Sequence, residues 1–130
     1  DPGALKALVP LLRDPVARVR ANAVIALKHM RGVNLTAPLR DMLEQGDART
    51  KISAIYAITD LNVSDLALLL KPLLAVPEPE IRMRAHEALE IMRRMGNLVA
   101  GAVLAEHTQG GPVVVEGLDF SPGEWDEPLD

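Results

Sequence analysis

Residues 19–27 read VRANAVIAL, and the same pattern returns as TKISAIYAI at 50–58 and as IRMRAHEAL at 81–89. Each copy lies 31 residues after the previous one, without a gap. Upstream leucines keep the same register, as Leu8, Leu39 and Leu70 show. A fixed internal period of this length is typical of helical repeats that stack on one another. We therefore predict an all-α fold, an α-solenoid of about three 31-residue units.

Each unit is expected to be a pair of helices, because apolar residues recur at helical spacing on both sides of a chain breaker. The breakers are Asp14-Pro15, Gly46-Asp47 and Pro77-Glu78-Pro79. They place the first helices at about 4–13, 35–45 and 64–75, and the second helices at about 16–31, 48–61 and 79–95. The second helix of the first unit carries the stripe of a half-buried helix, formed by Val19, Ala23, Ala26, Leu27 and Met30.

One further helix is predicted at 97–109, because Gly110-Gly111-Pro112 then interrupts the pattern. A solenoid needs a cap on its last apolar face, so we interpret 97–109 as half a unit that caps the stack. The solenoid domain is then 1–109, with units at about 4–32, 35–62 and 64–96. Residues 110–130 form a second part, an acidic and partly disordered tail in which Val113 to Val115 are expected to be extended.

Composition excludes several classes of protein. Cysteine is absent, which removes disulfides, thiol chemistry and Cys-ligated zinc and fits a cytoplasmic protein. No apolar run reaches the roughly 20 residues that span a bilayer. The chain begins with Asp1 instead of methionine, and we expect it to be part of a larger protein.

Charge divides the chain in two. Residues 1–96 hold all 14 Lys and Arg and 11 of the 18 acidic residues, a balance of +3. Residues 97–130 hold the other seven acids and no Lys or Arg. An asymmetry of this size indicates two parts with different roles.

The first unit resembles a HEAT repeat. The resemblance rests on the run Leu8-Val9-Pro10-Leu11-Leu12-Arg13-Asp14-Pro15, followed by Val19-Arg20, Ala23 and Ala26-Leu27. The short period is similar to that of bacterial HEAT-like repeats, including those named after phycobilisome lyases. The resemblance implies that Asp14 and Arg20 join a ladder along the turn inside each unit, and that the second helices line the inner, concave surface.

The face of the second helices opposite the core stripe is the first candidate binding surface. It is formed by Arg18, Asn22, Ile25 and His29, then Arg49, Ser53, Tyr56 and Asp60, then Glu80, Arg84, Glu87 and Ile91. Most of these positions also suit a merely solvated face. Ile25 and Tyr56 differ, because an apolar and an aromatic residue among polar ones suggest a contact patch. Ordinary packing between units is the alternative for these two.

The tail is the second candidate. It combines acidic residues with the aromatics Phe120 and Trp125, a composition that suits a short recognition motif or a disordered, solubilising tail. As a motif, it would bind another protein or the basic part of its own chain.

Chemistry of other kinds finds little support. The three histidines, at 29, 86 and 107, lack the spacing of a helical metal site, and no nucleophile or phosphate-loop motif is present. We therefore predict no cofactor, no metal and no catalysis, and a protein-interaction scaffold or adaptor that binds another protein or peptide. The alternatives are a nucleic-acid-binding solenoid with an autoinhibitory tail, or an accessory subunit of an enzyme.

Overall fold

The computed structural model describes residues 2–30 and 34–110. Its helices, in chain order, are α1 (Pro2–Leu8), the 3₁₀ helix η1 (Val9–Arg13), α2 (Ala17–Lys28), α3 (Thr36–Gln45), α4 (Ala48–Leu61), α5 (Ser64–Ala67), the 3₁₀ helix η2 (Leu68–Ala75), α6 (Pro79–Arg94) and α7 (Leu98–Gly110). No strand occurs in these two ranges. The predicted all-helical fold is confirmed. The expected extended segment at 113–115 and the rest of the tail lie outside the described residues.

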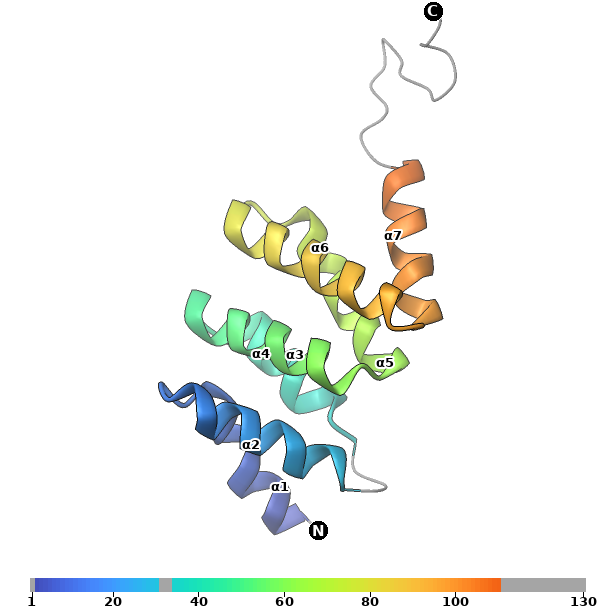
Figure 1. Cartoon of the computed structure of the whole chain (residues 1–130). Coiled ribbons are helices and arrows are strands. Elements are labelled where there is room, and N and C mark those ends of the chain that lie inside the picture. The colour runs from blue at the N-terminus through green and yellow to red at the C-terminus, as the bar shows by residue number, and fades with distance from the viewer. Residues whose placement is uncertain (1, 31–33, 111–130) are drawn as a thin grey trace, which may run out of the picture.

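The helices pair consecutively along the chain and form two layers. In Figure 1, α2, α4 and α6 lie one above another, and the helices that precede them lie on the other side. Within the pairs, α2 packs on η1, α4 on α3 and α6 on η2. Between the pairs, α4 contacts α6 much more extensively than it contacts α2. Because α4 also packs on η1, it links the first pair to the third.

Small side chains at fixed positions allow this stacking. Ala23, Ala54 and Ala85 are completely or almost completely buried, and Ala57 and Ala88 are buried one turn later. Because a methyl group lets two helix axes approach closely, large residues of both layers fill the remaining space. Those residues include Leu12, Leu39, Ile58, Leu70, Leu89 and Met92.

In the first and third pairs, the first helix changes from α to 3₁₀ geometry because it contains a proline. Pro10 and Pro72 occupy equivalent positions two periods apart, and both lie in the 3₁₀ segments. Proline has no N–H to donate and clashes with the carbonyl four residues back, so the α-helical ladder cannot continue through it. The equivalent residue in α3 is Asp41, and α3 stays α-helical throughout.

Local signals fix several helix ends. Asp47 caps α4, because its Oδ1 accepts from the Thr50 N–H at 2.9 Å, and this bond lowers the pKa of the Asp47 carboxyl. Pro79 begins α6 as predicted. Pro15 precedes α2 by two residues.

Gly96 and Asn97 turn the chain from α6 into α7. Gly96 has φ +91, and its N–H donates to Arg93 O while the Asn97 N–H donates to Met92 O, both at 2.9 Å. This pair of bonds is the Schellman motif, which favours glycine at the left-handed position. Asn97 Oδ1 then accepts from the Ala100 N–H at 3.0 Å and caps α7.

Asn97 also links two units. Its Nδ2 donates to Asn62 Oδ1 at 3.0 Å, and Asn62 is the left-handed residue that ends α4. The Asn97 side chain is 7% exposed. One buried amide therefore satisfies the start of α7 and the end of α4 together.

We predict that Asn97→Ala lowers the free energy of unfolding by about 2 kcal/mol, because a helix cap and a buried hydrogen bond are lost together. Asn97→Ser should cost less, since serine keeps a neutral cap and loses only the amide donor to Asn62. Urea unfolding followed by helical circular dichroism measures both. Asn34→Ala is the matched control, because Asn34 caps the Thr36 N–H at the surface. Equal losses in all three variants would contradict the inter-unit role.

Gly46 ends α3 where a side chain has no room. A Cβ at this position would lie 2.5 Å from the main-chain oxygen of Met42 and 2.7 Å from the Cβ of Thr50. We predict that Gly46→Ala lowers the free energy of unfolding by about 1–3 kcal/mol through overpacking.

Gly101→Ala is the control for this effect. A Cβ on Gly101 meets only the flexible Arg93 side chain, at 3.4 Å, and alanine favours a helix interior by about 0.5–1 kcal/mol. Thermal unfolding should therefore shift down for Gly46→Ala and stay unchanged or shift up for Gly101→Ala. A shift of the same sign in both would contradict the steric explanation.

Candidate functional site

A groove of about 390 Å³ lies between the second helices α4 and α6. Its lining consists of Ile52, Ser53, Ile55, Tyr56, Thr59 and Asp60 from α4, Arg84, Glu87, Ala88 and Ile91 from α6, and Arg20 from α2. The groove exists because α4 and α6 stack through alanines, which bring the helices close without filling the surface above the contact.

Apolar and charged groups are separated within this groove. Ile55 is 4% exposed, whereas Tyr56 is 49% exposed and offers a ring surface to a partner. Asp60, Arg84 and Glu87 are exposed. Arg84 Nη2 lies 3.3 Å from Glu80 Oε2 on the same helix, an ion pair at the surface. A lining that combines an exposed aromatic ring, apolar side chains and charges resembles a protein-interaction surface.

The structure divides the sequence-predicted site residues into three groups. Ser53, Tyr56, Asp60, Arg84 and Glu87 line the α4/α6 groove, although Ser53 is only 9% exposed. A second group is exposed but does not line it, and consists of Arg18, Asn22, Ile25, His29 and Arg49. Phe120 and Trp125 lie outside the described residues.

Sequence reasoning missed Ile52 and Ile55, two of the groove's apolar residues. These two residues lie outside the apolar stripe of α4 that packs against α3. Their spacing of three residues on a second side of α4 was the available signal, because a middle helix of a stack must bury two faces.

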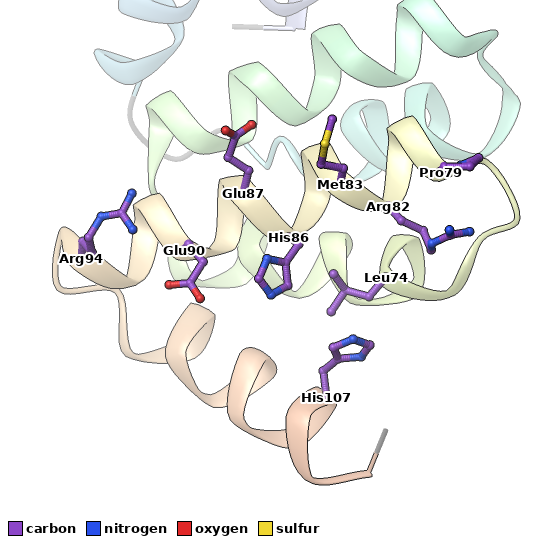
Figure 2. A pocket seen from close by; sticks show the side chains of 9 residues that line it. All are labelled: Leu74, Pro79, Arg82, Met83, His86, Glu87, Glu90, Arg94 and His107. Atoms are coloured by element: carbon purple, nitrogen blue, oxygen red, sulfur yellow. The ribbon is translucent and has the colours of Figure 1, made fainter. Parts of the chain in front are cut away.

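A larger groove, of about 640 Å³, lies between α6 and α7. Figure 2 shows His86 and Glu90 pointing from α6 towards α7, and His107 pointing from α7 towards α6, with Leu74 between them. Arg93 donates to Glu90 Oε1 through Nε at 3.1 Å and Nη2 at 2.9 Å, and this hydrogen bonding lowers the pKa of Glu90. The fold thus brings two histidines together from positions 21 residues apart. The described part of the chain holds no cluster of three or more potential metal ligands.

The predicted ladder inside the units is present in a different form. Arg20 Nη1 donates to the main-chain oxygens of Asp14 at 2.7 Å and Pro15 at 3.3 Å. Arg82 Nη1 makes the same pair of bonds to Val76 O at 2.8 Å and Pro77 O at 3.0 Å. Because the acceptor is a main-chain carbonyl, the first residue of the turn need not be acidic, and valine serves in the third unit.

The comparisons with known proteins agree with this geometry. The family model described as HEAT repeat matches residues 4–30, the range that holds most of α1, all of η1 and α2, and the turn that Arg20 braces. The first helix pair is a HEAT repeat. A search of the curated proteins found no match. The predicted HEAT-like family is confirmed, and the similarity to the phycobilisome-lyase type stays a prediction.

Among the described residues, none of the helices combines the length and the apolar character that spanning a bilayer requires.

We predict that Arg82→Met lowers the free energy of unfolding by about 1 kcal/mol, because two main-chain carbonyls lose their donor. Arg84→Met should change stability by less than about 0.5 kcal/mol, since a surface ion pair contributes little. Urea unfolding of the two variants distinguishes the brace from the groove residue. Equal stabilities would contradict a structural role for Arg82.

Proposed function

We propose that this HEAT-like repeat protein is a non-catalytic scaffold or adaptor module, and that it binds a segment of a partner protein in the α4/α6 groove. The observation that carries the proposal is the exposed Tyr56 ring beside the buried Ile55, in a groove whose lining also carries charges of both signs. Repeat solenoids expose extended surfaces of this kind and commonly use them to bind other proteins. The proposal includes the architecture and the location: a solenoid of three 31-residue units with a half-unit cap and an acidic tail, in a cytoplasmic protein.

Charge distribution favours a protein partner over a nucleic acid. The face that carries the groove mixes Arg49 and Arg84 with Asp60, Glu80 and Glu87. A surface that binds the phosphate backbone needs a continuous basic stripe. The mixed pattern instead suits a peptide that carries both an apolar anchor and charges of its own.

The test uses random peptides displayed on phage and selected on the full chain. Selected peptides are then titrated against variants by fluorescence anisotropy. We expect Tyr56→Ala to weaken binding by about tenfold or more, because an exposed aromatic at the centre of a groove is the usual anchor. Ile25→Ala measures how far the contact extends onto α2.

Leu98→Ala is the matched control, since it truncates a large exposed side chain on α7, outside the groove. Its affinity should equal that of the unchanged protein. Selected peptides that bind Tyr56→Ala as tightly as the unchanged protein would refute the groove as the binding site.

A further inference from the structure

The outer face of α6 departs from the repeat. Val24 in α2 and Ile55 in α4 occupy equivalent positions, and both are almost completely buried. The equivalent residue in α6 is His86, which is exposed. Thr59 of α4 likewise corresponds to Glu90 of α6. The side of α6 that faces away from α4 therefore cannot bury another regular unit without desolvating ionisable groups.

The helix α7 packs on α6, α5 and η2, but no second helix follows it in the part of the chain that the structure describes. Every earlier first helix is covered by the second helix of its own pair. The α6/α7 groove lies beside α6, where the regular alternation of helices would place the next second helix. It is an unfilled position of the solenoid with a polar lining.

The lining can pair with acidic side chains through its arginines and histidines, and its two arginines and two glutamates balance in formal charge. Its cationic and titratable groups are Arg82, Arg94, His86 and His107, against the carboxylates Glu87 and Glu90. Glu90 already receives two hydrogen bonds from Arg93. Glu87 is the other carboxylate of the lining. Leu74 and the exposed Met83 add apolar surface.

We propose that residues 111–130 of the same chain dock in the α6/α7 groove. This segment contains Glu116, Asp119, Glu124, Asp126, Glu127 and Asp130, no Lys or Arg, and two of the chain's three aromatics. Its acids complement the arginines and histidines of the groove. Phe120 and Trp125 supply the apolar surface that the missing second helix would have placed against α7.

The tether makes this docking intramolecular. The segment follows α7 directly, and His107, within the last turn of α7, already lines the groove. An extended chain gains about 3.3 Å per residue, whereas the 16 residues of α6 span only about 24 Å. The segment therefore reaches the whole groove at an effective concentration of about millimolar.

Trp125 reports on this contact without a label, because it is the only tryptophan in the chain. In the full chain, docking predicts blue-shifted Trp125 emission and protection from acrylamide quenching. Arg94→Glu reverses an exposed charge of the groove and should raise the quenching constant by about twofold or more. His86→Glu should act in the same direction, and added salt should reproduce the effect.

Arg84→Glu is the matched control, because it reverses an exposed charge on the other side of α6. Its quenching constant should stay that of the unchanged chain, and helical circular dichroism should show all three variants folded. Three results would overturn the proposal. The first is that Trp125 is quenched as strongly as free indole. The second is that Arg84→Glu exposes Trp125 as much as Arg94→Glu does. The third is that the protection of Trp125 grows with protein concentration, which would indicate docking on a second copy.

Discussion

Each helix pair in this protein is too short to bury its own apolar side chains, so it must pack against the neighbouring pair. The alanines that recur every 31 residues make that possible, because they let α2, α4 and α6 approach until the larger side chains interlock. A buried Leu or Ile contributes about 1.5–3 kcal/mol, and these residues become buried only once the pairs are stacked. Because the helices approach so closely, the two grooves lie at the surface, one between α4 and α6 and the other between α6 and α7.

The two grooves differ because their helices stand at different places in that stack. α4 is covered on both sides, and apolar residues such as Ile55 serve the contact with α6. α6 contacts α4 on one side, and the side that faces α7 carries His86 and Glu90. An interior contact thus leaves an apolar groove with charged edges, whereas the end of the stack leaves a polar groove. The kind of partner each can bind follows from that position.

The 31-residue period was enough to predict the helices to within a few residues, since each breaker and each apolar stripe is a local signal. It also indicated Tyr56 as an unusual residue on an exposed face. It did not predict the 3₁₀ segments around Pro10 and Pro72, although the prolines were visible. The period could not predict the grooves. The α6/α7 groove, for example, brings His86 and His107 to one surface only because of the way the chain turns at Gly96 into α7. The ladder was expected from Asp14 and Arg20, but the sequence could not show that Arg20 binds main-chain oxygens, because every residue has a main-chain carbonyl.

The chemistry of the two ends of the stack also bears on how the protein avoids associating with itself. At the first unit, Leu11 is 37% exposed, whereas its equivalents Met42 and Leu73 are buried, so that end is partly apolar. At α6 the corresponding stacking face is ionisable. An apolar end that met this face would bury the exposed His86 without a partner, a cost in free energy that the exposed leucine does not offset. The two ends of the described stack are therefore poorly matched to each other.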